Sequence, residues 1–494
     1  MTTNTLISID LAEPPRLSNP APIAPPVERS GTPAWRPLFG GCLLKLPRVV
    51  WMALDMVILC TGTTLGNELF VWWSGGLRLT DVSQWLTNVV QASAVILAGG
   101  IFGLYEPKTI WARSRIVARC LLTVTLAMLL SWAVMHLLMY SSLSRRAAAT
   151  GFVFFLMFAS SYRLLAHGAI RSVRRGLLVI GQGPATGLII RSVRRGAVPG
   201  YRLVGLVAGN GAIAERGLSD VPIVGQLDDI ERVCRDHRVA EVVVADRAAD
   251  DPEFQRAALK CLRLGCRVTN ETTFYETAFE EVPAAHITPN WFLLADLKGQ
   301  CEEHAMFKRV FDLAVAALGI VLTVPFWPLI ALAVRLQGSG SVFYAQTRVG
   351  HGGRHFTLYK FRTMRGDAES NGTTWAQPND PRVTFVGRFL RRTRLDELPQ
   401  MWNILKGDMS LVGPRPERPE FVDPLTSLIP FYSERHLIKP GLTGWAQLNY
   451  RYGSTVADAR KKLQLDLYYI KHMSLELDLV ILLRTLGTFF LGSR

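Results

Sequence analysis

The chain has 494 residues, 49% of them hydrophobic, and a formal net charge of +15 from 55 basic and 40 acidic side chains. This length is too great for one ordinary domain, and the mean hydropathy of +0.20 favours a membrane protein over a wholly soluble one. The charge predicts an anionic partner, such as nucleic acid, anionic lipid or a phosphorylated substrate. The seven cysteines form no CxxC pair and no zinc spacing, which argues against a disulfide framework and favours a reducing compartment.

Residues 1–44 are rich in proline and poor in bulky apolar side chains, as in EPPRLSNPAPIAPPVE. Such a segment cannot bury enough surface to fold, so we expect a disordered tail. It does not read as a signal peptide, because no apolar core follows a basic start.

Four apolar stretches follow within residues 45–166, each near the length that crosses a ~30 Å hydrocarbon core. The first contains Asp55, and Arg163 closes the short fourth one. Basic residues outside and between the stretches predict that both ends of the region face the cytoplasm, although Arg145 and Arg146 oppose this. The alternative is a soluble bundle of buried helices. The stretches are residues 49–72, 89–105, 120–140 and 147–162.

Residues 167–300 read differently: GLLVIGQGPATGLIIRSVRRG predicts a buried strand, a glycine turn and a helix, and further strands and helices alternate after it. This alternation is typical of a parallel α/β sheet. Gly181, Gly183 and Gly187 could seat a diphosphate at a helix N-terminus. Their spacing departs from GxGxxG, and no acidic residue ends the second strand at 203–208, where a dinucleotide ribose would be held. A bound dinucleotide stays open, and a structural or regulatory Rossmann-like domain is favoured.

A fifth apolar run, residues 313–334, lies within the segment 308–336 and is long enough to span a membrane. A single crossing would carry everything after it away from cytoplasmic nucleotides. Pro325, near the centre, and Pro328 remove backbone hydrogen bonds and kink a helix. We therefore predict a re-entrant helix, with a kinked spanning helix as the alternative. The basic residues expected at the headgroups are Lys308, Arg309 and Arg335, with Lys471 and Arg484 on the apolar C-terminal segment.

Two adjacent acids, Asp396 and Glu397, follow a basic glycine-rich hairpin segment and stand among many arginines. On a helix that begins near Asp396 the two carboxylates would point about 100° apart, so they would serve different partners. One could attack phosphorus while the other holds a divalent cation, if arginines spread the phosphate charge. Arg415, between Pro414 and Pro416, would be a preorganised phosphate fork. The alternative is a helix N-terminus whose acids only favour the dipole.

Several long motifs occur in a fixed order from residue 308 onward: KRVFD, the proline-kinked helix, YKFRTM, NDPRVTFVGRFLRRTRLDELPQMWNILKGDMSLVGPRPERPEF and KPGLTGWAQLNYRYG. In this the segment resembles the bacterial polyprenyl-phosphate hexose-1-phosphate transferases, the monotopic phosphoglycosyl transferases. The regions ahead of it resemble the large members, the undecaprenyl-phosphate glucose or galactose phosphotransferases. The resemblance implies a membrane α-helical N-terminal bundle, a Rossmann-like α/β middle domain at 167–300, and a monotopic, α/β-containing catalytic domain at 301–494.

The resemblance also implies roles for single residues. Asp396 matches the nucleophile that attacks the β-phosphate of a UDP-sugar, releases UMP and forms a covalent phosphosugar intermediate. Glu397 matches its acidic partner, and both are the expected Mg²⁺ ligands. Pro325 matches the proline that breaks the re-entrant helix, whereas Arg394 departs from the family, where a small residue is expected. Phosphate- or nucleotide-binding roles fall on Lys360, Arg362, Asp380, Arg382, Arg391, Arg415, Gln447, Asn449 and Arg451.

We therefore predict an enzyme of the bacterial inner membrane, with its catalytic and Rossmann-like domains in the cytoplasm, that transfers hexose-1-phosphate from a UDP-sugar to undecaprenyl phosphate. This would be the first step of an exopolysaccharide or O-antigen repeat. Glucose is the predicted hexose, because PRPERPEF and GLTGWAQLNYRYG resemble exopolysaccharide-type members, and galactose is second. Mg²⁺ is the expected cofactor, and the resemblance implies a homodimer. The alternatives are a non-catalytic membrane scaffold or sensor, and a nucleotide-sugar dehydratase, whose Tyr-x-x-x-Lys pair the chain replaces with YYIK.

Overall fold

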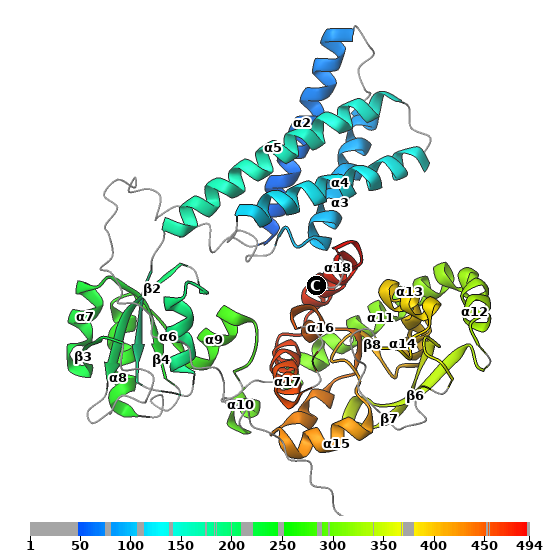
Figure 1. Ribbon diagram of the computed structural model, residues 1–494. Coiled ribbons are helices and arrows are strands. Elements are labelled where there is room, and N and C mark those ends of the chain that lie inside the picture. Colours follow the sequence, from blue (N-terminus) through cyan, green and yellow to red (C-terminus); the bar gives the residue numbers. More distant parts are fainter. Residues whose placement is uncertain are drawn as a thin grey trace, which may run out of the picture.

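Three groups of elements follow one another along the chain: N-terminal helices, a parallel α/β sheet and a mainly helical C-terminal part (Figure 1). The predicted N-terminal tail lies outside the described residues. The structure is a computed structural model that, apart from residues 182, 184, 199, 339, 367 and 454, describes residues 48–74, 81–105, 113–137, 142–172, 175–208, 221–245, 251–283, 289–294, 297–368, 380–450 and 453–491.

Three of the N-terminal helices contain segments long and apolar enough to cross a membrane: Val49–Leu69, Ile116–His136 and Ala149–Ala169. The predicted span at residues 89–105 falls short of them, because its helix opens with the polar turns DVSQWLTN and ends at Ile101. The helices are α2 (Arg48–Ser74), α3 (Asp81–Ile101), α4 (Arg113–Leu137) and α5 (Ser142–Ser172).

An ion pair compensates the acid noticed in the first apolar stretch. Asp55 on α2 and Arg163 on α5 are both fully buried, and their Oδ2 and Nη2 atoms lie 2.7 Å apart. The Tyr162 hydroxyl also donates to Asp55 Oδ1 at 2.7 Å. Because an isolated charge is costly in a nonpolar interior, this pairing explains how an acid and a base fit into two apolar helices.

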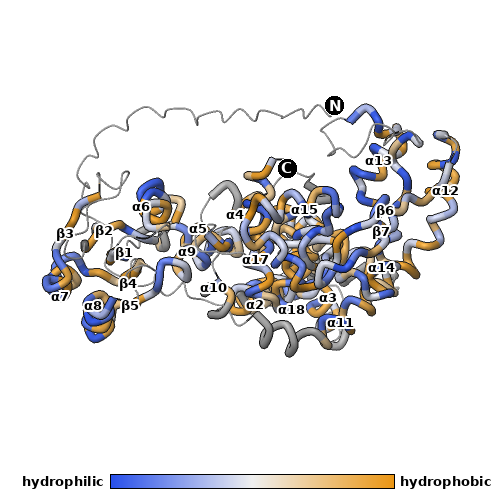
Figure 2. The backbone as a smooth tube through the Cα atoms, turned by 90° about the horizontal axis from the view of Figure 1, so that it is seen from below, coloured by the Kyte–Doolittle hydropathy of each residue, from blue (hydrophilic) through white to orange (hydrophobic). Residues whose placement is uncertain are grey.

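The middle region is the predicted parallel α/β sheet. Its five strands have the order β3-β2-β1-β4-β5, and all neighbours are parallel. The strand order reverses between β1 and β4, which places a crevice at the carboxyl ends of these strands. Hydrophilic and hydrophobic residues alternate around the covering helix α8 (Figure 2). The elements are β1 (Arg175–Ile180), α6 (Thr186–Arg194), β2 (Tyr201–Ala208), β3 (Ile223–Gln226), η2 (Leu227–Asp229), α7 (Ile230–Asp236), β4 (Val239–Val244), α8 (Pro252–Arg263), β5 (Arg267–Asn270) and α9 (Glu271–Phe279).

The fifth apolar run forms two helices separated by a turn. Helix α11 (Leu297–Thr323) stops at a 3₁₀ turn, η5 (Val324–Phe326), which contains Pro325, and α12 (Trp327–Arg335) follows. Their apolar side chains face outward: Val321 is 69% exposed and Leu329 is 66% exposed. The segment Met306–Arg335 is the fourth that is long and apolar enough to cross a membrane, and only 6% of its apolar window is buried.

Four basic residues expected at lipid headgroups are held by protein groups. Lys308 Nζ lies 2.5 Å from Asp478, and Arg309 donates to the carbonyls of Ile404 and Leu405 at 2.6 and 2.8 Å. Lys471 pairs with Glu276, and Arg484 lies over the Trp445 ring. All four cations therefore have partners within the protein, and their place at the lipid headgroups stays a prediction.

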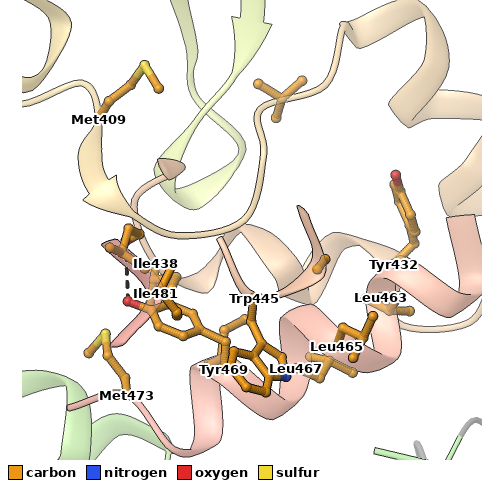
Figure 3. Close-up of a cluster of buried hydrophobic side chains, with 14 of the residues drawn as sticks. Met409, Tyr432, Ile438, Trp445, Leu463, Leu465, Leu467, Tyr469, Met473 and Ile481 are labelled. Atoms are coloured by element: carbon orange, nitrogen blue, oxygen red, sulfur yellow. Dashed lines mark hydrogen bonds between the residues drawn. The ribbon is translucent and has the colours of Figure 1, made fainter. Parts of the chain in front are cut away.

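The C-terminal part is built around one apolar cluster. Met409, Leu463, Tyr469 and Ile481 meet there with the Trp445 indole (Figure 3). Its elements are α10 (Pro289–Leu294), β6 (Phe343–Val349), η6 (His351–Gly353), β7 (His355–Phe361), α13 (Phe385–Thr393), η7 (Leu395–Glu397), α14 (Gln400–Lys406), β8 (Ser410–Val412), α15 (Pro419–Leu428), η8 (Tyr432–Leu437), β9 (Gly441–Thr443), α16 (Trp445–Asn449), α17 (Val456–Lys471) and α18 (Leu475–Leu491).

Both upstream regions contact this C-terminal part. Helix α18 packs on α3 at Gly487, where a Cβ atom would lie 2.3 Å from the Ile101 carbonyl oxygen, so only glycine fits. Helix α9 and the residues after it contact α16 and α17: the Trp445 indole N–H donates to the Glu280 carbonyl at 2.9 Å, and Val282 N–H donates to the Gln464 carbonyl at 3.1 Å. The α/β sheet is therefore joined directly to the C-terminal part.

Candidate active site

A tight turn between α13 and α14 presents the two acids. Helix α13 ends at Thr393 and is capped by Arg394, whose φ of 53° places it in the left-handed region that residues other than glycine rarely adopt. One 3₁₀ turn, η7, then carries Asp396 and Glu397, so the acids precede α14 rather than begin it as we predicted. Leu395 and Leu398 pack against the cluster around Phe361 and hold the turn. Because 3₁₀ residues follow at three per turn, neighbouring carboxylates still point in different directions.

Glu397 lies at the centre of a group of cations. Its side chain is buried, and its Oε1 accepts hydrogen bonds from Arg415 at 2.8 Å and from Lys360 at 3.2 Å. Arg394 adds a third cation, 4.0 Å from Oε2. Burial acts to raise the pKa of Glu397, but the charges of Arg415 and Lys360 outweigh it and hold the pKa well below its usual range. Glu397 is therefore anionic at any physiological pH.

Asp396, in contrast to Glu397, is buried without hydrogen-bond donors from the described residues and has a raised pKa. It is only 7% exposed, and within the described part of the chain its carboxylate accepts no hydrogen bond. Burial and the adjacent charge of Glu397 raise its pKa to about 6, against the opposing pull of Lys360, Arg391 and Arg415. Two neighbouring carboxyls with pKa values pushed apart are the usual sign of two different chemical roles. The Asp396 carboxylate has its lone pairs available, whereas Oε1 of Glu397 is engaged by Arg415 and Lys360.

The β6–β7 hairpin supplies cations on the face toward the acids. Lys360 pairs across the hairpin with Tyr344, and Arg348 lies on the same face because strand side chains alternate. Burial lowers the pKa of Lys360, although Glu397 opposes the shift. Arg348 Nη1 donates to the Pro416 carbonyl at 3.0 Å and so holds the Pro-Arg-Pro loop. Sequence reasoning missed Arg348, which the alternation of the predicted hairpin could have revealed.

A buried network holds the same loop from behind. Arg435 Nη2 donates to the Arg415 carbonyl at 3.2 Å and to Asp466 Oδ2 at 2.8 Å, and its Nη1 donates to the Tyr432 hydroxyl at 2.7 Å. Arg435 and Asp466 are both almost completely buried. This ion pair joins residues 31 positions apart in the sequence, and no local pattern predicts it.

The other predicted site residues lie outside this cluster or only partly reach it. Arg391 donates to the Thr363 hydroxyl at 2.9 Å and acts on Asp396 through its charge. Arg382 pairs with Asp380 at 2.6 Å, and Arg362 lines a pocket of about 450 Å³ beside the end of α12. None of the remaining predicted residues that the structure describes hydrogen-bonds to either acid. They are Arg362, Asp380, Arg382, Gln447 and Asn449, while Arg451 lies outside the described residues.

The two acids fit the expected Mg²⁺ as a partial ligand set. Among the described residues, no group of three or more His, Cys, Asp or Glu side chains could hold a metal ion alone. Mg²⁺ is commonly held by one or two carboxylates together with substrate phosphates. Asp396 offers an unbonded carboxylate and Glu397 has its Oε2 4.0 Å from the nearest cation, so both have oxygen atoms to offer.

Two family models match the chain. Residues 303–492, which include both acids and their cations, match the model described as bacterial sugar transferase. Residues 100–268, which include most of the parallel sheet, match the model described as CoA-binding domain. The first match places the whole candidate site inside one family domain.

Curated relatives match over different lengths. The UDP-N-acetylgalactosamine-undecaprenyl-phosphate N-acetylgalactosaminephosphotransferase of Aeromonas hydrophila is 41% identical over 254 residues, 51% of this chain and 59% of the relative. The UDP-glucose:undecaprenyl-phosphate glucose-1-phosphate transferase of Escherichia coli K12 is 44% identical over 182 residues, 36% of this chain and 39% of the relative. The chain thus covers less than two thirds of either.

A third relative aligns over more of its length. The UDP-glucose:undecaprenyl-phosphate glucose-1-phosphate transferase of Klebsiella pneumoniae is 31% identical over 327 residues, 65% of this chain and 68% of the relative. The alignment is too long to lie within the C-terminal domain alone, so it also takes in upstream regions. With the family match at residues 303–492 and the acids among their cations, this similarity shows that the chain belongs to the bacterial sugar transferases, the family of undecaprenyl-phosphate sugar-1-phosphate transferases.

Proposed function

We propose that this protein transfers a sugar-1-phosphate from a UDP-sugar to undecaprenyl phosphate and releases UMP. The observation that carries the proposal is the contrast between the two acids. Glu397 fixes Arg415 and Lys360 beside a buried Asp396, whose carboxylate accepts no hydrogen bond from any described residue. A nucleophile needs unengaged lone pairs, and a phosphorylated substrate needs preorganised cations, and this turn supplies both.

In the first step, Asp396 Oδ attacks the β-phosphorus of the UDP-sugar. The bond from that phosphorus to the bridging oxygen breaks, and UMP leaves with the electron pair. The product on the enzyme is an acyl phosphate that carries the sugar. Arg415 and Lys360 stabilise charge on the phosphate oxygens, with Arg391 close enough to lower the pKa of Asp396. Mg²⁺ held by Asp396 and Glu397 would neutralise part of the diphosphate charge.

In the second step, a phosphate oxygen of undecaprenyl phosphate attacks the same phosphorus. The Asp396 Oδ–P bond breaks, the carboxylate is restored, and the product is undecaprenyl diphosphate sugar. Asp396 is mostly an anion at neutral pH, because its pKa is about 6, and the phosphate monoester of the lipid is an anion by its own chemistry. No general base is therefore required, which agrees with a site that contains cations and carboxylates but has no histidine in contact with Asp396 among the described residues.

The apolar helix pair supports a re-entrant membrane insertion. At its first end, Arg309 is bonded to the last turn of α14. At its other end, Val334 packs with Phe361 and Leu390 of the hairpin and α13. Contacts of both ends with the same domain support placing both ends on the same side of the membrane. Such a helix would bring the turn with Asp396 close to the membrane surface, where a soluble nucleotide sugar and a lipid phosphate can meet.

The topology can be tested with single cysteines before and after the helix pair. Arg256→Cys in the α/β region and Ser427→Cys in the C-terminal part are both exposed. A membrane-impermeant maleimide applied to inverted vesicles should label both above the native background. Labelling of one from the inside and the other from the outside would establish a spanning helix instead.

Glucose remains the proposed sugar and galactose the second, and the Aeromonas relative adds N-acetylgalactosamine to the set worth testing. The test is UMP release by purified protein with Mg²⁺, undecaprenyl phosphate and each of these UDP-sugars. Release should depend on UDP-glucose and on the lipid acceptor. Absence of release with every sugar would favour the scaffold alternative, and preference for another sugar would correct only the choice of substrate.

A further inference from the structure

The match to a CoA-binding domain raises the question of what the glycine turn of the α/β region binds. In sheets of this kind, a nucleotide diphosphate lies at the turn after β1, where amide groups of the next helix face it. The turn here contains Gly181, with a φ of 79°, and Gly183, and it opens onto the crevice between β1 and β4. A diphosphate bound in the usual way would need this space.

A carboxylate of the protein already occupies it. Glu271, the first residue of α9, is completely buried, and its Oε1 accepts a hydrogen bond from the Thr186 hydroxyl at 2.9 Å. That hydroxyl in turn accepts from the Gly183 N–H at 2.9 Å. A Cβ atom at Gly183 would lie 2.1 Å from Glu271 Oε2, so the carboxylate is packed directly on the glycine.

This arrangement does not fit a nucleotide diphosphate. The Thr186 hydroxyl that would face a phosphate donates to the Glu271 carboxyl instead, and the Gly183 amide donates to that hydroxyl. A second acidic group in the same buried space would meet like charge. The end of β2 does not provide a ribose-binding site either, because the strand ends at Ala208 and not at an acidic residue. The glycine at position 183 is explained by the close approach of Glu271, without any ligand.

We propose that Glu271 takes the place of the phosphate, and that the glycine turn of this domain binds no nucleotide diphosphate. The bond to Thr186 instead fixes the beginning of α9. The other end of α9 contacts the C-terminal part, because Glu276 pairs with Lys471 at 2.8 Å and the Glu280 carbonyl accepts from Trp445. The turn thus serves as an internal anchor for the helix that joins the two regions.

Calorimetric titration tests whether the glycine turn, occupied by Glu271, binds a nucleotide diphosphate. ADP, CoA and NAD⁺ are added up to millimolar concentration to the full-length protein in detergent, with adenosine as the phosphate-free control. We expect no saturable binding to the glycine turn. Any binding that does appear should be lost in Arg415→Ala and kept in Thr186→Val, because the nucleotide would then be bound at the candidate active site. Saturable binding that is lost in Thr186→Val and kept in Arg415→Ala would overturn the proposal.

Hydrogen exchange tests the anchor without any ligand. Glu271→Gln removes the charge but keeps the shape, and it should raise amide exchange in residues 271–279 roughly ten-fold, as expected for a lost charge-assisted hydrogen bond. Glu253→Gln is the matched control, because Glu253 is also near the start of a helix, α8, but is exposed. Equal exchange in both variants would refute the anchor. Neither measurement depends on UMP release, so refutation of the anchor and refutation of the proposed reaction can be told apart.

Discussion

The substitution Asp396→Asn should abolish UMP release and also stabilise the fold. Burial and Glu397 raise the pKa of Asp396 from 3.8 to about 6, and the shift corresponds to roughly 3 kcal/mol at about 1.4 kcal/mol per pH unit. A carboxyl whose pKa is raised by folding contributes fully below its unfolded pKa, and that contribution is lost as the pH rises through the folded pKa. Wild type therefore carries this cost at neutral pH. Asparagine has no charge to bury and avoids it.

Thermal unfolding of the purified proteins at about pH 5 and about pH 7.5 measures the effect. The advantage of the variant should be larger at the higher pH by the equivalent of about 1 kcal/mol, because part of the loss occurs below pH 5. Asp423→Asn, on the exposed side of α15, is the matched control and should show no such difference. An advantage of Asp396→Asn that is the same at both pH values would refute the assignment of a raised pKa.

Three further changes follow from the same contacts. Glu397→Gln leaves two cations without their anion, and it should cost about 3–5 kcal/mol of stability as well as most activity. Because the pKa of Glu397 is depressed, its stabilisation is present above about pH 4 and is lost only as the pH falls further. The stability deficit should therefore be equal at pH 5 and 7.5, and a deficit confined to one pH would contradict this. Arg435→Met should destabilise the protein by about 3 kcal/mol and lower kcat/KM through the loop that Arg435 supports. Adding Asp466→Asn to the same protein should restore part of the stability, because the unpaired carboxylate is removed. A double variant whose loss equals the sum of the losses of the two single variants would contradict the pairing. Glu276→Gln should lower the unfolding temperature by the equivalent of about 1–3 kcal/mol in scanning calorimetry, and no change would show that the contact of α9 with the C-terminal part is energetically neutral.

Local sequence patterns predicted the parts of this protein that are local in structure. The two acids and Arg415 lie within one short segment, so their type and spacing already indicate phosphate chemistry. The parallel sheet followed from the alternation of strand and helix patterns. The break at Pro325 followed from the missing backbone donor.

What the sequence could not predict depends on distant partners. Lys308 and Arg309 looked like headgroup anchors, yet their partners are Asp478 and the end of α14, far along the chain. The Arg435 side chain reaches Arg415 only because η8 folds behind the loop. The carboxylate at the glycine turn comes from Glu271, 85 residues after Thr186, and only the packing of the sheet brings them together.

The covalent intermediate is the central claim, and intact-protein mass spectrometry tests it most directly. Wild type is incubated with UDP-glucose and Mg²⁺ without undecaprenyl phosphate, quenched rapidly in acid and weighed, and the modified peptide is then sequenced. The account predicts a mass increase of one hexose phosphate on Asp396, absent in Asp396→Asn and discharged when the lipid phosphate is added. UMP release without any such adduct, or an adduct on another residue, would contradict it.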